Sequence, residues 1–422
     1  MKKRVMTIVI ITVLLFAAAA GCARGDSGAD NTAAPETQAP ASPPASESPP
    51  ESTPPSTGDT DQRDSADVAN KPNTLDVDVS MIARHPGFSR LAGAENFLVG
   101  VSIRTLANPF FYAQAVLLQQ YLTELGFRTT GVMDANMDLD REIEIIEQMI
   151  AQEADLIIIV GIQPGASEDA VQHAISNGVP TIAAVVDLGS APSFNVVCDN
   201  ALNGYLAGYH LGANYLRGET INSIHIGDFA EAEGPGADRA RGMFAGIVAA
   251  RLDLDYSQAF QIGSGMFDDM LNTGRAANTE ADFNILGVGY GELQEELGLA
   301  AAEELLAANQ RQINLMTGEN DIILRGAFRA VENFGIQEQV YMIAGSDAHS
   351  GTVRRMMEDP GFQLVATGIN SPYMIAAAVG EAVAEVLIDG RDPDSFPVSI
   401  LASAGIVTKD NAPQAFNPGS LY

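Results

Sequence analysis

The stretch FLVGVSIRTLANPFFYAQAVLLQQYLTELG, residues 97–126, combines an apolar run, a short loop and a helix-forming segment in one unit. The uninterrupted apolar run at 97–103 predicts a strand that is buried on both faces. Asn108 is suited to cap a helix that begins at Pro109, the favoured first position, and ends before Gly126. The two phenylalanines follow the cap, at the exit of the strand, where a sheet core does not need them.

The same alternation of apolar run and helical segment continues along the chain. Four apolar residues recur at helical spacing and predict a helix: Leu139, Ile143, Ile146 and Ile150. A further helix is predicted near Ser167–Asn177, and further strands at 155–161, 179–186, 221–227, 282–288, 313–317, 339–345 and 361–367. Strands that alternate with helices predict parallel sheets covered on both faces. The roughly 340 residues that carry this pattern are enough for two lobes.

The N-terminal segment has the pattern of an export signal. Three basic residues at 2–4 precede an apolar run at 5–20 that is shorter than the ~20 residues of a membrane-spanning helix. The sequence AAGC at 19–22 resembles a bacterial lipobox, which implies that Cys22 carries lipid; an ordinary secretory signal is the alternative. Residues 1–22 are therefore expected to be a lipoprotein signal. Residues 23–95, rich in Pro, Ser, Thr and acidic residues, are expected to form a tether and lead-in.

Charge and cysteine content exclude several classes of protein. The formal net charge is −31, which argues against nucleic acid as a partner and against a DNA-binding regulator. The chain has two cysteines, so lipidation of Cys22 leaves no intrachain disulfide. Cys198 ends the apolar run FNVVC, which favours a buried strand thiol over a catalytic one.

Polar and aromatic side chains follow the predicted strands, where open parallel sheets bind ligands. They are Asn108, Phe110, Phe111, Asp187, Arg239, Arg241, Tyr290, Glu319, Asn320, Asp347 and Asn370. The set contains no nucleophile with a base and no histidine pair. Carboxylate, amide and guanidinium groups suit vicinal hydroxyls, because a hydroxyl donates to one and accepts from another. Aromatic faces suit the apolar face of a sugar ring.

Five motifs on this framework resemble the ribose-binding type of periplasmic solute-binding protein, whose bilobed core also occurs in lactose-repressor-type regulators. They are NPFF (108–111), DNALNGYLAGYHL (199–211), DRARG (238–242), GEND (318–321) and GSDA (345–348). The resemblance covers about 97–400. It implies an α/β protein of the periplasmic binding protein type I fold, with two doubly wound parallel-sheet lobes joined by a three-segment hinge. Lobe 1 is expected at 96–199 plus 371–399, and lobe 2 at 200–370 plus 400–422.

The resemblance also implies a ligand-binding set. It comprises Asn108 as a hydroxyl partner, Phe110 and Phe111 as ring walls, Tyr290 as a further aromatic wall, and Asp187, Arg241, Asn320, Asp347 and Asn370 as polar contacts. Of the two arginines in DRARG, Arg241 alone is taken as the ligand arginine, because Arg239 is equally well explained as a surface ion-pair residue. Leu188 follows Asp187 where ribose binders have arginine, which puts ribose itself in doubt. The stretch 253–281 is longer than the family pattern.

Three other site types are weighed and rejected. The stretch 134–144 has the look of a calcium loop but lacks its glycine and final glutamate, so acids that cap a helix are the better interpretation. GVGYG (287–291) does not have the spacing of a dinucleotide-binding loop. Asp187 and Asp347 could be a glycosidase pair, but hydroxyl recognition explains them without raised pKa values. No metal, no cofactor and no enzymatic activity are therefore expected.

The function that the sequence predicts is a lipid-anchored extracytoplasmic solute-binding protein. It captures a monosaccharide or related polyol between its lobes, and the resemblance implies delivery to an ABC-type permease. The alternative is a receptor that presents a signal molecule or nucleoside to a membrane sensor kinase. A monomer, held at the membrane by the lipid on Cys22 and without a nucleic acid partner, is expected in either case.

Overall fold

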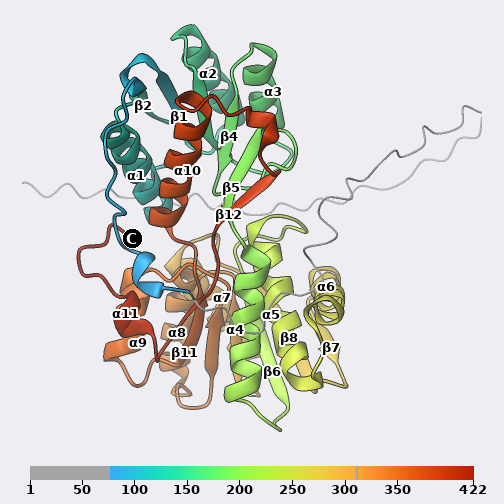
Figure 1. Ribbon diagram of the computed structural model, residues 1–422. Coiled ribbons are helices and arrows are strands. Elements are labelled where there is room, and N and C mark those ends of the chain that lie inside the picture. The colour runs from blue at the N-terminus through green and yellow to red at the C-terminus, as the bar shows by residue number, and fades with distance from the viewer. Residues whose placement is uncertain (1–76, 310–311) are drawn as a thin grey trace, which may run out of the picture. The chain divides into compact units, whose positions relative to one another are not determined.

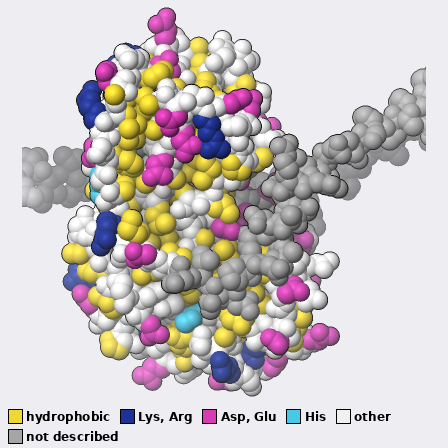
Figure 2. Space-filling view, in the orientation of Figure 1, with side chains coloured by type: hydrophobic (Ala, Val, Ile, Leu, Met, Phe, Trp, Pro, Cys, Tyr) yellow, Lys and Arg dark blue, Asp and Glu magenta, His cyan; other side chains and the backbone are white. Residues whose placement is uncertain are grey.

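A computed structural model describes residues 77–309 and 312–422, which belong to one compact unit that spans Asp61–Tyr422. The signal segment, Cys22 and most of the predicted tether lie outside the described residues. Among the described residues, no helix combines the length and apolar character needed to cross a membrane. On the face shown in Figure 2, acidic side chains are scattered rather than gathered in one patch.

The first sheet contains six strands within the described residues, and all of them are parallel. In spatial order they are β12 (Ser399–Ser403), β5 (Phe194–Cys198), β4 (Thr181–Ala184), β3 (Leu156–Val160), β1 (Leu98–Ile103) and β2 (Arg128–Asp134). Helices pack in two pairs, α1 (Pro109–Leu125) with α10 (Pro372–Leu387), and α2 (Leu139–Ala151) with α3 (Glu168–Ser176) (Figure 1). The predicted strand–helix alternation therefore folds as a doubly wound lobe.

The unit β1–α1 forms as the sequence predicts. Helix α1 spans Pro109–Leu125, the Asn108 side chain accepts a hydrogen bond from the backbone N–H of Phe110 at 2.8 Å, and Gly126 ends the helix with a φ of 103°. Helix α2 also forms, and Asp138 caps it. Its buried face is centred on Glu142, Ile145, Ile146 and Met149. Of the predicted stripe, Ile146 is buried and Ile143 and Ile150 pack half-buried against the same core, whereas Leu139 is exposed.

The second sheet contains seven strands within the described residues. In spatial order they are β13 (Ile406–Thr408), β11 (Leu364–Gly368), β10 (Tyr341–Ala344), β9 (Leu315–Gly318), β6 (Ile221–Gly227), β8 (Phe283–Tyr290) and β7 (Ala276–Asn278). The two edge strands, β13 and β7, are antiparallel to their neighbours and the others are parallel. The helices around it are α4 (Asn200–Asn214), α5 (Pro235–Leu252), α6 (Tyr256–Thr273), α7 (Glu295–Ala308), α8 (Asp321–Phe334), α9 (Ser350–Glu358) and α11 (Ala412–Ala415).

Helices α4 and α5 approach each other more closely than side chains would allow. A Cβ on Gly204 of α4 would lie 2.1 Å from a backbone oxygen of α5, and a Cβ on Gly242 of α5 would lie 2.1 Å from one of α4. Gly208 and Gly246, one turn further on, make the same kind of contact. This glycine contact fixes the rotation of α5 about its axis, and so decides which α5 side chains face the site.

The chain passes between the sheets three times, which confirms the three-segment hinge. It leaves the first sheet after β5, returns between β11 and α10, and leaves again between β12 and β13. Asn203 of α4 ties the crossings together: its Nδ2 donates to the Ile369 oxygen at 2.7 Å and its Oδ1 accepts from the Gly405 N–H at 2.8 Å. Because β12 pairs with β5 up to Ser403, the first lobe extends beyond the predicted boundary at 399.

Three short 3-10 helices complete the described fold: η2 (Val79–Met81), η3 (Ala94–Asn96) and η4 (Pro393–Ser395). Val79 and Ala94 are buried, so the end of the predicted lead-in is part of the folded unit. The long stretch 253–281 forms α6 and the edge strand β7. Helix α6 packs on α5 (Figure 1).

Candidate functional site

A cavity of about 170 Å³ lies at the carboxyl ends of strands from both sheets. In each sheet the first strand along the chain sits between the next two parallel strands, β1 between β2 and β3, and β6 between β8 and β9, so the direction of winding reverses beside it. The loops after β1 and β3 line the cavity from one lobe, and those after β6 and β9 line it from the other. This is where doubly wound sheets bind ligands.

The wall from the first lobe is largely apolar. It consists of Arg104, Asn108, Phe110, Phe111, Met137, Ile162, Gln163, Pro164, Val185 and Val186. The rings of Phe110 and Phe111 meet edge to face with centroids 5.4 Å apart. The Arg104 guanidinium lies 5.1 Å from the centre of the Phe111 ring, close enough for a cation–π contact. The two aromatic rings therefore support each other at the cavity.

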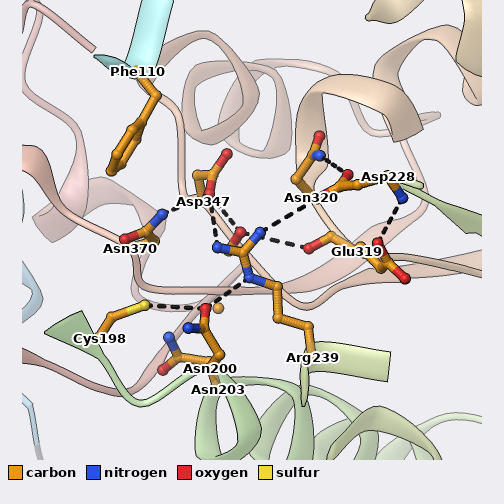
Figure 3. Close-up of polar contacts among 12 residues, drawn as sticks. Phe110, Cys198, Asn200, Asn203, Asp228, Arg239, Glu319, Asn320, Asp347 and Asn370 are labelled. Carbon is orange, nitrogen blue, oxygen red and sulfur yellow. Dashed lines mark hydrogen bonds and ion pairs between the residues drawn. The ribbon is translucent and has the colours of Figure 1, made fainter. Parts of the chain in front are cut away.

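The wall from the second lobe is polar, and Arg239 of α5 is at its centre (Figure 3). The Arg239 Nε donates to Asn200 Oδ1 at 2.9 Å, and its terminal nitrogens lie 3.7 Å from Asp228 Oδ2 and 3.9 Å from Asp347 Oδ1. Burial opposes the charge of Arg239, but Asp347 and the other acidic neighbours outweigh that effect and raise its pKa above the ordinary value. Arg239 therefore stays charged while only 6% exposed.

A third acid, Glu319, stands beside this arginine. Glu319 accepts a hydrogen bond from the backbone N–H of Asp228, and its other oxygen lies 3.4 Å from His225 Nε2. Asn320 donates to Asp228 Oδ1. Burial, followed by the negative charge of Glu319, raises the pKa of Asp228 well above its usual value. The polar wall is thus held by hydrogen bonds among its own side chains.

Asp347 and Asn370 form one end of the cavity. Asn370 Nδ2 donates to Asp347 Oδ1 at 3.0 Å, the Ser346 hydroxyl donates to the same oxygen, and the Tyr422 hydroxyl donates to Asp347 Oδ2 at 2.8 Å. Asn370 is 4% exposed, and its Oδ1 has no hydrogen-bond partner within the described part of the chain. A buried amide oxygen without a donor is costly, so a ligand that supplies a donor would be favoured here.

One direct hydrogen bond joins the two walls at the cavity rim. Gln163 Nε2, on the loop after β3, donates to Glu231 Oε1, on the loop after β6, at 3.1 Å. Both residues line the cavity and come from different lobes. The lobes therefore meet at the rim of the site.

Residues 99–392 match the family described as "Periplasmic binding protein domain". The chain belongs to the periplasmic binding protein family. The family is one of extracytoplasmic binding proteins and not of enzymes, and the chain resembles its ribose-binding type.

Individual relatives agree with this placement. The chain is 24% identical to the ribose import binding protein of Bacillus subtilis over 302 residues, which are 71% of this chain and 84% of that protein. A solute-binding protein of a Mycobacterium smegmatis ABC transporter, solved with glycerol bound, superimposes with a TM-score of 0.61 at 20% identity, covering 77% of this chain and 98% of that one. One from Actinobacillus succinogenes, solved with D-allose, gives 0.58 at 20% identity, covering 75% and 99%.

Five of the residues predicted for the site line the cavity of this periplasmic binding protein: Asn108, Phe110, Phe111, Asp347 and Asn370. Two others lie directly behind the polar wall. Asn320 is buried, caps α8 and bonds Asp228, while Tyr290 packs beside Gly227 and Glu319. Neither of these two lines the cavity.

Asp187 points away from the cavity, contrary to the sequence-based assignment. Its carboxylate is exposed and accepts hydrogen bonds from the Gly189 N–H and the Ser399 hydroxyl. Val185, just after β4, has a φ of 71°, a conformation that is strained for a β-branched residue. The bend there places Val185 and Val186 on the cavity. Leu188, the departure from the ribose pattern, is buried in the core of the first lobe.

Arg241 also lies away from the cavity, and Arg239 stands where the sequence analysis placed Arg241. The Arg241 guanidinium lies 4.6 Å from the centre of the Phe267 ring of α6 and 3.7 Å from carboxylates of Asp238 and Asp268. These contacts belong to the surface between α5 and α6. The interpretation of Arg239 as a surface ion-pair residue is therefore wrong, because Arg239 is buried among the cavity acids.

Sequence reasoning missed several residues of the wall, including Arg104, Met137, Gln163, Asp228, Glu231 and Leu293. Most follow strands directly, so a fuller survey of strand ends would have found them. No residue of 253–281 lines the cavity. Cys198 is buried as predicted, and burial raises the pKa of its thiol to about 12, which leaves it unreactive. Asp138 of the rejected calcium loop caps α2, and the described residues contain no cluster of side chains arranged for a metal ion.

Proposed function

We propose that this periplasmic binding protein captures a monosaccharide or related polyol between its lobes and delivers it to an ABC-type importer. The observation that carries the proposal is the Oδ1 of Asn370, which has no hydrogen-bond partner among residues 77–309 and 312–422 and is buried at the cavity beside the carboxylate of Asp347. A ligand with neighbouring hydroxyls can donate to both of these acceptors. The same hydroxyls can accept from Arg239, because a hydroxyl has lone pairs as well as a proton.

The opposite wall supports the same class of ligand. Phe110 and Phe111 offer apolar surface to the C–H face of a sugar ring, while hydroxyls on the ring edge meet the polar wall. The cavity, at about 170 Å³, is smaller than the ~300 Å³ and upward of sites for drug-sized ligands. A single sugar or small polyol is therefore the expected size.

The relatives support the ligand class without naming the ligand. Related structures hold glycerol, D-allose and myo-inositol, which share neighbouring hydroxyls on a small carbon skeleton. Leu188, which stands where the resemblance implies an arginine, is buried in the core of the first lobe and does not line the cavity, so the hydroxyl pattern of ribose is not the only one to test.

A ligand that contacts both walls favours the closed arrangement of the lobes by its higher affinity for that arrangement. The importer would recognise this closed form. The lipobox-like sequence at 19–22 supports a lipid anchor at the cell membrane, with Cys22 as the attachment and the Pro-rich segment as a spacer.

A thermal-shift screen against pentoses, hexoses, polyols and nucleosides tests the ligand class. A compound that binds only the folded protein raises its Tm by mass action as the concentration passes Kd. We expect at least one sugar or polyol to do so, and expect the shift to be lost in Asn370→Leu. A shift with nucleosides alone, or with no compound, would contradict the proposal.

Metabolic labelling with a fatty-acid probe tests the anchor separately. Label is expected in the wild-type protein and not in Cys22→Ser. Equal labelling of the two proteins would exclude lipid attachment at this residue.

A further inference from the structure

Tyr422 lies against the ligand site, although the chain reaches it more than fifty residues after Asn370. Its hydroxyl donates to Asp347 Oδ2 at 2.8 Å. Its ring meets the ring of Phe110 edge to face, with centroids 5.2 Å apart and planes at 88°. The side chain therefore touches one residue of each wall, a polar one from the second lobe and an aromatic one from the first.

The segment that carries Tyr422 is held in place by hydrogen bonds to the rest of the fold. Asn417 Nδ2 donates to the Ala83 oxygen at 2.7 Å, and the Leu421 N–H donates to the Tyr373 hydroxyl of α10 at 2.9 Å. On its other side the Tyr422 ring packs edge to face on His349, with centroids 4.7 Å apart. Tyr422 is 5% exposed. These contacts fix the ring at this position.

A second, smaller cavity lies on the other side of Asp347 and Asn370, and the Tyr422 side chain borders it. It is bordered by Tyr422, Ile82, Ser350 and Pro372, and it shares Asp347 and Asn370 with the main cavity. Asp347 and Asn370 thus form a partition between the two spaces, and Tyr422 supports that partition from the side of the smaller one. Without the ring, Phe110 and Asp347 would each lose a neighbour and could move toward the smaller cavity.

We propose that Tyr422 is a positioning and specificity-determining residue of the ligand site. Its hydroxyl holds the Asp347 carboxylate in one orientation, and its ring keeps Phe110 in place and limits the size of ligand that fits beside Asp347. Asp347 Oδ2 is occupied by this bond, so a ligand meets a carboxylate that has already been oriented. The inference rests on the proposed function, because it concerns the same ligand.

The chemistry of the contact agrees with this role. Burial and the neighbouring charges of Asp347 and Asp321 raise the pKa of Tyr422 well above its usual value. The phenol therefore remains a hydrogen-bond donor throughout the physiological range. Loss of the hydroxyl removes a bond to a charged group, and loss of the ring removes packing. These two effects can be separated by two substitutions.

The test measures Kd for the panel pentose and hexose that bind the wild-type full chain, beginning with D-ribose and D-allose. The pyranose forms of these two sugars differ by one CH2OH group. Tyr422→Phe keeps the ring, and we expect it to weaken both sugars by roughly three- to tenfold. Tyr422→Ala also opens the partition, and we expect it to shift the ratio of the two Kd values about tenfold toward the larger sugar.

Tyr112 provides matched controls, because it is 53% exposed and lies on the outer side of α1. Tyr112→Phe and Tyr112→Ala are expected to keep both Kd values. The ratio of the two Kd values is the decisive readout. If Tyr422 only stabilised the fold, its loss would lower the Tm and the fraction of protein that binds, but it would leave this ratio unchanged. If Tyr422→Phe binds both sugars with wild-type affinity, or if Tyr422→Ala leaves the ratio of the two Kd values unchanged, the inference about Tyr422 is wrong and the proposed function still stands. Failure of the wild type to bind any sugar or polyol overturns the proposed function and this inference with it.

Discussion

The units β1–α1 and β6–α5 hold equivalent places in their sheets, and the sequence predicted them with unequal success. Each begins at the strand where the winding reverses, and each supplies one wall of the cavity. In β1–α1 the loop is short, Asn108 caps the helix, and the two phenylalanines follow it directly. In β6–α5 the loop is longer, and the helix begins at Pro235 after Gly234, which makes no side-chain cap bond.

The difference teaches that a cap fixes the first turn, whereas rotation further along a helix is set by packing. Arg239 and Arg241 are two residues apart, so on a helix of 3.6 residues per turn they point to nearly opposite sides. Arg239 shares a side with Gly242 and Gly246, which face α4, at spacings of three and seven residues. That glycine stripe was visible in the sequence and would have selected Arg239.

The largest expected effect on ligand affinity appears when Arg239 and Arg241 are each replaced by alanine and the two variants are compared. Arg239→Ala leaves Asp228 and Asp347 buried without their cation, and removing one partner of a buried ion pair costs about 3–5 kcal/mol. We expect ligand affinity to fall at least a hundredfold, measured by calorimetric titration of the folded protein. Arg241→Ala removes only partly exposed contacts and should leave the affinity unchanged, with at most about 1 kcal/mol lost in stability.

If Arg239→Ala does not fold, Arg239→Lys provides an alternative test. Lysine keeps the charge near the acids but cannot reproduce the planar fork that reaches Asn200, Asp228 and Asp347 together. A folded Lys variant with reduced affinity would support the assignment. Equal affinity in the Arg239 and Arg241 variants would contradict it.

Most of the fold could be predicted from local pattern. Uninterrupted apolar strands, capped helices and their alternation are short-range features, and they led to the two doubly wound lobes and to helix α1 at its exact bounds. The edge strands β2, β7, β12 and β13 were not predicted. Strands β12 and β13 pair with segments far away in the sequence, whereas β2 and β7 contain no uninterrupted apolar run of useful length. The α2 face was predicted in part, because three of the four predicted residues meet the core, but the polar Glu142 is buried with its apolar neighbours and moves the centre of that face.

The site was predictable where a side chain follows its strand directly, as Asn108, Asp347 and Asn370 do. It was not predictable where the backbone bends between strand and side chain. The positive φ of Val185 turns Asp187 toward Ser399, and no residue type in that stretch announces the bend. The contact of Tyr422 with Asp347 joins positions 75 residues apart, and it depends on how the last segment packs over the hinge.

A substitution in the aromatic wall, on the β1–α1 unit, is expected to have an intermediate effect on ligand affinity. Phe111→Ala should weaken ligand binding by roughly 1–3 kcal/mol, the scale of burying such a side chain, and should release Arg104 from its ring contact. Tyr112→Ala, the neighbouring change on the exposed side of α1, should leave Kd at its wild-type value. Titration of both variants with one sugar decides the matter. An unchanged Kd in Phe111→Ala would show that this ring is a core residue and not a ligand wall.

The smallest effect on binding is expected behind the polar wall, at Asp321. It is fully buried, its Oδ2 accepts from the His349 N–H at 2.9 Å, and burial followed by the charge of Asp347 raises its pKa well above the usual value. The raised pKa favours the protonated carboxyl in the folded protein, and a protonated carboxyl resembles an amide, so Asp321→Asn should keep the wild-type affinity. Its consequence should appear in stability instead.

The sign of that stability change follows from linkage. An unfolded aspartate ionises near pH ~3.9, whereas folded Asp321 holds its proton to higher pH, so the folded state is progressively disfavoured as pH rises from about 4 through the folded-state pKa. Asp321→Asn removes this titration. The Tm of the variant minus that of the wild type should therefore grow with pH over this range and then become constant. A difference that is the same at pH 4 and pH 8 would mean that Asp321 is ionised in the folded protein, and that the polar wall carries one more negative charge than we infer.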